Sequence, residues 1–236
     1  MQQLLQTLTI LLLLCLSGCK QDPTPGTPTP QPQPTVSLQY LALGDSYTVG
    51  QGVAEVERWP VQLTERLRQR GYAFEDAFII ARTGWTTQDL KKGLADATSS
   101  RDTFDLVSLL IGVNNQYRGQ DLSLYVTEFG ELLDQAVVLA GGRWNRVFVL
   151  SIPDYGVTPF GQNGDTARIA REIDTYNHIA DSICTYRNIA FFDITPISRQ
   201  ALDDPSLIAR DALHPSGKMY TAWVDLIQSG VEELLK

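Results

Sequence analysis

The chain is poor in several features that define whole classes of protein. Among its 236 residues are only three cysteines and two histidines, and no cluster of the two has the spacing of a metal site. Acidic residues outnumber basic ones 27 to 19, for a net charge of −8, and no run of like charges occurs. We therefore expect no metal, no cofactor and no nucleic-acid partner.

Long apolar runs are also missing: the apolar run near the N-terminus is too short to cross a membrane. Residues 8–16 form an apolar stretch of about nine residues, whereas a membrane-spanning helix needs roughly 20. It ends in Leu16-Ser17-Gly18-Cys19, which resembles the lipobox of bacterial lipoproteins, although no lysine or arginine precedes the run. The resemblance implies a signal peptide over residues 1–18 and a lipid on Cys19. The alternative is an ordinary signal peptide with a chance cysteine.

A proline-rich segment follows the candidate lipid anchor. Six of the 12 prolines lie between residues 23 and 34, a composition typical of a polyproline II stalk rather than of a packed core. Residues 19–35 are thus predicted to link a membrane anchor to a globular domain over residues 36–236. No aspartate directly follows Cys19, which favours the outer membrane of a bacterial envelope. We assume a monomer, since nothing in the sequence indicates the oligomeric state. Cys184 has no partner for a disulfide in this layout.

Short apolar runs alternate with amphipathic ones in the globular part. The apolar runs predict five strands, near residues 36–43, 77–81, 104–111, 147–152 and 189–194. Helical spacing or helix-start signals appear at residues 59–71, from 88, and at 122–140, 167–186 and 215–235. Strands that are apolar throughout and joined by helices predict a single three-layer α/β/α domain around a parallel sheet.

Polar residues come directly after several of these strands. Ser46 follows the first strand, Gly84 the second and Asn114 the third, while Asp211 and His214 lie beyond the fifth. Open parallel sheets bind their ligands at the carboxyl ends of the strands. The order of these residues therefore predicts that they meet at one edge of the sheet.

Four short blocks carry a family resemblance. Over residues 38 to 235 the chain resembles the SGNH (GDSL-type) serine hydrolases, through Gly44-Asp45-Ser46-Tyr47, Gly84 within residues 83–87, Gly112-Val113-Asn114-Asn115 and Asp211-Ala212-Leu213-His214. The third block of the family usually ends in aspartate, and here Asn115 takes its place. The resemblance implies a flavodoxin-like five-stranded sheet and an enzyme that cleaves carboxylic esters.

The residue types suit that chemistry. Ser46 needs a base to accept its proton, and histidine, with an ordinary pKa near 6.5, is the natural one. His214 is therefore the expected base, and Asp211 the expected acid that orients it, if residues 211–214 form one turn. The resemblance assigns the oxyanion hole to the backbone N–H groups of Ser46 and Gly84 and to the side-chain amide of Asn114.

Substrate contacts are less sharply indicated. Tyr47, Trp85 and Tyr155 are candidates for lining the substrate pocket. A packing role is an equal alternative for Tyr47 and Trp85, and for Trp59. The turn-rich loop over residues 153–161 and the segment 116–118, which includes Arg118, are candidate walls or lids.

The predicted function is serine-dependent hydrolysis of an ester, either a short-chain acyl ester or an acetylated glycan, by an enzyme anchored in the cell envelope. Two alternatives use the same residues differently. One is an O-acetyltransferase that passes the acyl group to an envelope glycan. The other is a non-catalytic glycan-binding lipoprotein. The sequence specifies neither the acyl chain nor the alcohol.

Overall fold

The structure is a computed structural model that describes residues 37–97 and 103–236. The predicted signal peptide, the lipidation site Cys19 and the proline-rich stalk lie outside the described residues. Within the described ranges, no helix combines the length and apolar character needed to cross a membrane.

Five parallel strands form one sheet, in the spatial order β2-β1-β3-β4-β5. The strands are β1 (Tyr40–Gly44), β2 (Phe78–Ala81), β3 (Leu106–Leu110), β4 (Val147–Leu150) and β5 (Ala190–Phe192). β1 pairs with β2 on one side and β3 on the other, so the chain switches direction across the sheet at β1. This order is the flavodoxin-like one, which confirms the predicted fold class.

Burial differs between the central and the edge strands. Every residue of β1, β3 and β4 is buried, as expected for strands covered on both faces. β2 and β5 are edge strands, and most of their residues are only partly buried, with Phe78 exposed. An apolar sequence, which all five strands share, therefore corresponds to burial on both faces only in the inner three.

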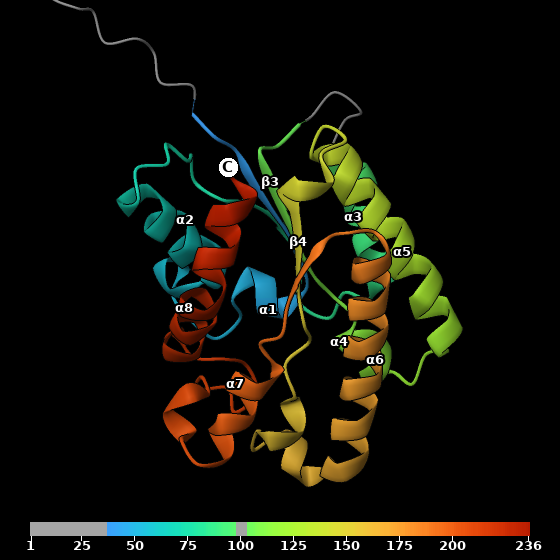
Figure 1. Ribbon diagram of the computed structural model, residues 1–236. Helices are drawn as coiled ribbons and strands as arrows, with labels where there is room; N and C mark the ends of the chain where they lie inside the picture. Colours follow the sequence, from blue (N-terminus) through green and yellow to red (C-terminus); the bar gives the residue numbers. More distant parts are fainter. Residues whose placement is uncertain (1–36, 98–102) are drawn as a thin grey trace, which may run out of the picture. The chain divides into compact units, whose positions relative to one another are not determined.

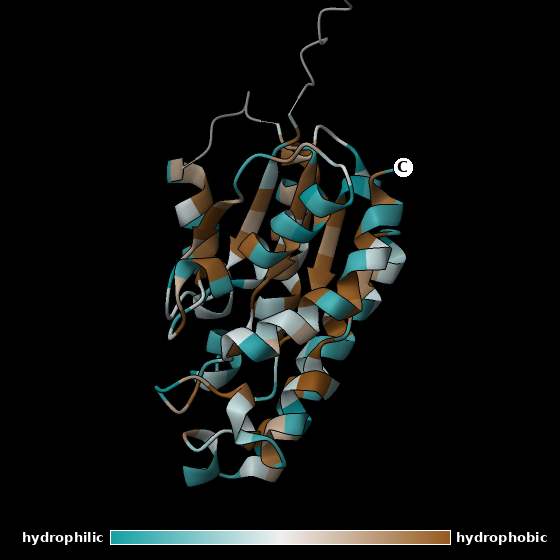
Figure 2. Ribbon diagram, turned by 90° about the vertical axis from the view of Figure 1, so that its left-hand side faces the viewer, coloured by the Kyte–Doolittle hydropathy of each residue, from teal (hydrophilic) through white to brown (hydrophobic). Residues whose placement is uncertain are grey.

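Helices cover both faces of the sheet. α2 (Trp59–Gln69) and α8 (Gly217–Leu234) lie side by side on one face, and α3 (Thr87–Ala97), α5 (Leu122–Leu139) and α6 (Thr166–Tyr186) on the other (Figure 1). Figure 2 shows the strands as mostly hydrophobic ribbon between helices whose outer surfaces are more hydrophilic. Each long helix therefore contributes an apolar stripe to one of the two cores.

Several short helices were not predicted from the sequence. α1 (Ser46–Val49), α4 (Val113–Tyr117) and α7 (Thr195–Arg199) lie towards the lower end of the sheet in Figure 1, beyond the carboxyl ends of the strands. Single turns of 3₁₀ helix occur at Glu55–Glu57, Trp144–Arg146, Tyr155–Val157, Gly161–Asn163, Gln200–Leu202 and Pro205–Leu207. Two of the short helices, α1 and α4, begin within the sequence blocks that carry the family resemblance.

The turn from β1 into α1 has no room for a side chain at Gly44. A Cβ atom there would lie 2.2 Å from Oγ1 of Thr48 and 2.5 Å from the carbonyl oxygen of Leu110 in the neighbouring strand. Both distances are far below van der Waals contact. The glycine thus allows α1 to fold back against the end of the sheet, which sets the position of Ser46.

We expect Gly44→Ala to destabilise the fold by at least about 2 kcal/mol, because the added methyl group overlaps backbone as well as side-chain atoms. Thermal or urea unfolding of the purified domain measures the loss. Gly142→Ala is the control: unlike Gly44, Gly142 has a positive φ, of 77°, but a Cβ there meets no atom within 4 Å. The control should cost only about 1 kcal/mol, from backbone strain. Equal losses in the two variants would contradict the steric explanation.

Candidate active site

Ser46 is the first residue of α1, at the carboxyl end of the inner strand β1. Asp45 precedes it as the helix N-cap and accepts a hydrogen bond of 3.0 Å from the backbone N–H of Tyr47. Ser46 is largely buried, yet it lines a cavity that opens to the surface. The predicted nucleophile is therefore held rigidly at a strand-to-helix turn rather than on a mobile loop.

The carboxyl group of Asp45 is enclosed by the core beneath Ser46. The residue is fully buried, and its Oδ2 atom has no hydrogen-bond partner among the described residues. Burial raises the pKa of Asp45 from its ordinary 3.8 to about 7, against the smaller lowering effect of hydrogen bonds from backbone N–H groups. Asp45 therefore orders the turn without carrying a full negative charge at neutral pH.

Asp211 and His214 form a pair within one tight turn. The ring Nδ1 of His214 lies 2.7 Å from Oδ2 of Asp211, and Oδ1 accepts hydrogen bonds from the backbone N–H groups of His214 and Leu213. Ala212, between them, has a left-handed φ of 65°. Burial acts to raise the pKa of Asp211, but the hydrogen bonds from His214 and Leu213 outweigh it and hold the pKa below its usual range. An ionised carboxylate thus faces Nδ1 and leaves Nε2 for the cavity.

The last helix begins two residues later than the sequence predicted, so His214 lies three residues before it rather than one. The predicted helix began at residue 215, whereas α8 begins at Gly217 with Ser216 as its N-cap. The hydroxyl of Ser216 accepts a bond from the backbone N–H of Met219 and so defines that start.

Three N–H donors border the cavity near Ser46. Among the described residues, no acceptor takes up the backbone N–H of Ser46 or of Gly84. The side-chain amide of Asn114 donates one hydrogen bond, of 2.9 Å, to the carbonyl of Trp85, and the second hydrogen of its NH₂ group remains available. Gly84 has φ of 82°, a backbone conformation that glycine adopts without strain.

The cavity that joins these groups has a volume of about 210 Å³. Ser46, Gly84, Asn114 and His214 all line it, so the structure brings together four of the five predicted site residues, and Asp211 stands behind His214. Its remaining walls are mostly apolar or aromatic, and are formed by Tyr47, Gln51, Thr83, Val113, Tyr117, Tyr155, Phe160 and Leu213. This is the usual composition of a small-molecule site.

The predicted substrate-contact residues divide into two groups. Tyr47 and Tyr155 line the cavity, and the ring of Tyr47 packs edge-on against His214 with the centroids 5.6 Å apart. Trp85 does not line the cavity, because its indole packs onto α3 at Gly93, where a Cβ would collide with the ring. Trp59 is fully buried in the core.

Two further aromatic walls come from the two segments that the sequence predicted as walls or lids, 116–118 and 153–161. Tyr117 lies at the end of α4, three residues after Asn114, and Phe160 lies in the loop 153–161 that was predicted as a wall. Arg118, the next residue after Tyr117, contacts the loop that carries Gly84: its guanidinium donates a 2.5 Å hydrogen bond to the carbonyl of Gly84. The segment 116–118 is therefore part of a helix and its cap, fixed against the Gly84 loop.

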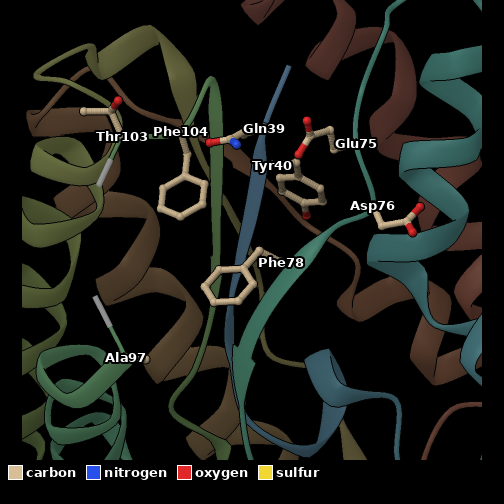
Figure 3. A pocket seen from close by; sticks show the side chains of 8 residues that line it. All are labelled: Gln39, Tyr40, Glu75, Asp76, Phe78, Ala97, Thr103 and Phe104. Atoms are coloured by element: carbon tan, nitrogen blue, oxygen red, sulfur yellow. The ribbon is translucent and has the colours of Figure 1, made fainter. Parts of the chain in front are cut away.

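A larger cavity, of about 550 Å³, lies elsewhere on the sheet (Figure 3). Phe78 and Phe104 stack within it at 6.0 Å, and Glu75 and Asp76 stand on its other side. No histidine or serine is among the eight described residues that line it, so it lacks a nucleophile paired with a base. Among the described residues, no group of three or more histidine, cysteine or acidic side chains is placed to hold a metal ion.

Asn115, the residue that departs from the family pattern, joins the two loops that carry Gly84 and Asn114. Its Nδ2 donates to Oγ1 of Thr87 at 2.7 Å and to Gln120 at 2.9 Å, and its Oδ1 accepts from the backbone N–H of Thr87. The Thr87 hydroxyl in turn donates to the buried carboxylate of Glu128. An aspartate at position 115 would face that hydroxyl together with Glu128, and the hydroxyl has only one proton to donate.

Asn115→Asp should therefore destabilise the protein by about 2–4 kcal/mol, because two buried carboxylates would share one donor. Adding Glu128→Gln should recover part of the loss, since the glutamine amide can donate where the carboxylate cannot. Urea unfolding of the two single variants and the double variant measures this coupling. Additive losses would show that Asn115 and Glu128 do not interact through Thr87.

The raised pKa of Asp45 predicts a pH-dependent stability. The folded protein keeps a proton on Asp45 that the unfolded chain releases above its ordinary pKa, so the free energy of unfolding should fall as pH rises from about 4 to about 7. Asp45→Asn keeps the cap acceptor and removes the titration. Between about pH 4 and pH 8 it should gain on the order of 2–4 kcal/mol relative to the parent protein. If the free energy of unfolding depends on pH in the same way for the two proteins, the raised pKa of Asp45 is contradicted.

Comparisons with known proteins agree with this geometry. The model of the GDSL-like lipase/acylhydrolase family matches residues 42–222, whereas a search of curated proteins finds no match. Among solved structures, TesA aligns with a TM-score of 0.65 at 18% identity, over 84% of this chain and 99% of its own.

Two acetyl xylan esterases have similar folds. A variant of Axe2 from Geobacillus stearothermophilus aligns with a TM-score of 0.61 at 20% identity, over 82% of this chain and 94% of its own. AlAXEase aligns with a TM-score of 0.64 at 18% identity, over 82% of this chain and all of its own. These likenesses support the fold, and the family model covers both the block of Ser46 and that of His214. The chain belongs to the GDSL-like lipase/acylhydrolase family and is a carboxylic ester hydrolase.

Proposed function

We propose that the protein hydrolyses short-chain esters, with acetylated glycans as the favoured class, through an acyl-enzyme on Ser46. The observation that carries the mechanism is the His214–Asp211 pair, whose ring lines the same cavity as Ser46 and the three N–H donors. A base, an orienting acid, a nucleophile and an oxyanion site within one cavity are the complete set for acyl transfer.

In the acylation step, the Ser46 hydroxyl oxygen attacks the ester carbonyl carbon while its proton passes to Nε2 of His214. The negative charge that develops on the carbonyl oxygen is stabilised by the N–H groups of Ser46, Gly84 and Asn114. The bond to the alcohol then breaks, and His214 returns the proton to the leaving oxygen. Asp211 stabilises the imidazolium in between, and its lowered pKa keeps it ionised for that role.

Deacylation repeats these steps with water as the nucleophile. Water attacks the acyl carbon while His214 takes a proton from that water. The bond between the acyl carbon and the Ser46 oxygen then breaks, and His214 returns the proton to the serine oxygen. The volume of about 210 Å³ and the aromatic walls favour a short acyl group over a long chain in this cavity. The similarity to two acetyl xylan esterases supports an acetyl group on a sugar.

We expect Ser46→Ala to lower kcat on p-nitrophenyl acetate by roughly 10⁴-fold or more without unfolding the protein. The serine hydroxyl is the proposed nucleophile, and alanine leaves the rest of the cavity in place. Initial rates and circular dichroism of the purified variant test this. Ser182→Ala on the exposed face of α6 is the control and should keep full activity. Substantial turnover by Ser46→Ala would rule out the mechanism.

We further propose that the enzyme is held at the bacterial envelope by a lipid on Cys19, which the lipobox-like sequence and the proline-rich stalk support. Cells grown with labelled palmitate should incorporate the label into the full-length chain and lose it on Cys19→Ser. Cys184→Ser should leave labelling intact, since Cys184 is buried in the folded domain. Label that persists in the Cys19 variant, or never attaches, would contradict the anchor.

A further inference from the structure

A second cavity, of about 360 Å³, adjoins the candidate active site. The two cavities share Tyr117, Tyr155 and Phe160, so these three rings form a common aromatic wall. Beyond the wall the second cavity is lined by α4, by the loop around Gly161–Asn163 and by the first turns of α6. It therefore continues the catalytic cavity in a direction away from Ser46.

The aromatic wall offers exposed ring surface at its rim. Tyr117 and Phe160 keep 59% and 42% of their surface exposed, with ring centroids 6.1 Å apart, while Tyr155 is buried behind them. The wall is fixed at both ends to the catalytic groups. Tyr117 belongs to α4, which carries Asn114, and the backbone N–H of Phe160 donates to the carbonyl of Ala212 in the His214 turn.

The far side of the second cavity is polar and charged. Arg168 and Glu172 stand one turn apart on α6, with Nε and Oε1 separated by 3.9 Å, and both side chains are partly exposed. The side-chain amide of Gln116, on α4, donates a 2.6 Å bond to the other carboxylate oxygen of Glu172. Guanidinium donors and a carboxylate acceptor thus face a cavity whose opposite wall is aromatic.

This combination matches a sugar ring. A pyranose has a flat face of C–H groups, which packs on an aromatic ring, and an edge of hydroxyl groups, which need both donors and acceptors. A fatty acyl chain has apolar C–H surface but no hydroxyl groups. Burying it against Arg168 and Glu172 would desolvate both charges without compensation.

The alcohol half of the substrate is the part that can reach this cavity past Phe160. His214 must lie beside the leaving oxygen, because it protonates that oxygen, and Phe160 is hydrogen-bonded to the turn that carries His214. We propose that the second cavity is a subsite for a neighbouring sugar ring of an acylated oligosaccharide, with Tyr117 and Phe160 as the stacking surface and Arg168 and Glu172 as hydroxyl-binding groups. This rests on the proposed ester hydrolysis and specifies its substrate class.

The test compares two acetyl esters that differ only in the alcohol, acetylated xylobiose and acetylated xylose. The parent enzyme should have the higher kcat/KM on the disaccharide. Arg168→Ala and Tyr117→Ala should each lower the ratio of disaccharide to monosaccharide kcat/KM about tenfold, since each removes a contact to the second ring. Tyr117 also lines the catalytic cavity, but a loss that both esters share cancels in the ratio. Tyr117→Phe should retain the ratio, because the stacking ring remains. Arg171→Ala, an exposed arginine on the same helix that does not line the cavity, should leave both values unchanged.

Three outcomes would overturn the inference. The disaccharide preference could be absent from the parent enzyme, or equal in the parent and in the Arg168 and Tyr117 variants. Alternatively, Arg168→Ala, which alters the second cavity only, could change the dependence on acyl length across p-nitrophenyl acetate, butyrate and octanoate, which would assign the cavity to the acyl chain. Hydrolysis of p-nitrophenyl acetate by the parent enzyme separates these results from failure of the proposed function, because that ester does not need the subsite.

Discussion

The structure depends first on the close approach between the end of β1 and the helix that follows it. Gly44 lies against both the Thr48 side chain and the backbone of β3, and any side chain there would force α1 away from the sheet. Since Ser46 is the first residue of α1, this contact decides where the hydroxyl stands relative to the other strand ends. The same tight turn buries Asp45 and raises its pKa, so part of the folding stability is given up to hold the serine in place.

The other site residues are positioned by bonds between loops rather than within them. Asn114 donates to Trp85 and Arg118 to Gly84, so the segments after β2 and β3 are held to each other. Phe160 connects the segment after β4 to the His214 turn in the same manner. These bonds hold the loops of the site in two linked pairs, which suits a reaction that depends on preorganised N–H donors.

Much of this arrangement could be predicted from the sequence, because its main signals are local. Apolar runs of strand length and helices of regular period specify a parallel α/β sheet, and chain order alone brings residues such as Ser46 and His214 to its carboxyl edge. Local patterns did not distinguish inner from edge strands, since β2 and β5 are as apolar in sequence as their neighbours. Helices of four or five residues, such as α1 and α4, are too short to show any period.

The walls of the site were harder to predict because they depend on tertiary contacts. Trp85 is adjacent to an oxyanion candidate in sequence, yet its indole packs away from the cavity against α3. The glycine at position 93, isolated within a predicted helix, was the available signal for that packing. Tyr117 and Phe160 meet only in the folded chain, from segments after different strands, and no spacing in the sequence relates them. The predicted catalytic roles themselves concern chemistry and require a kinetic test.

That chemistry depends on a covalent bond between the acyl group and Ser46. The most direct measurement is to stop the reaction with p-nitrophenyl acetate by acid within its first turnovers and to map the digested protein by mass spectrometry. The peptide that contains Ser46 should carry the mass of one acetyl group, and the adduct should disappear as substrate is exhausted. Steady hydrolysis with no acetylated peptide, or with acetyl only on another residue, would contradict the acyl-enzyme on Ser46.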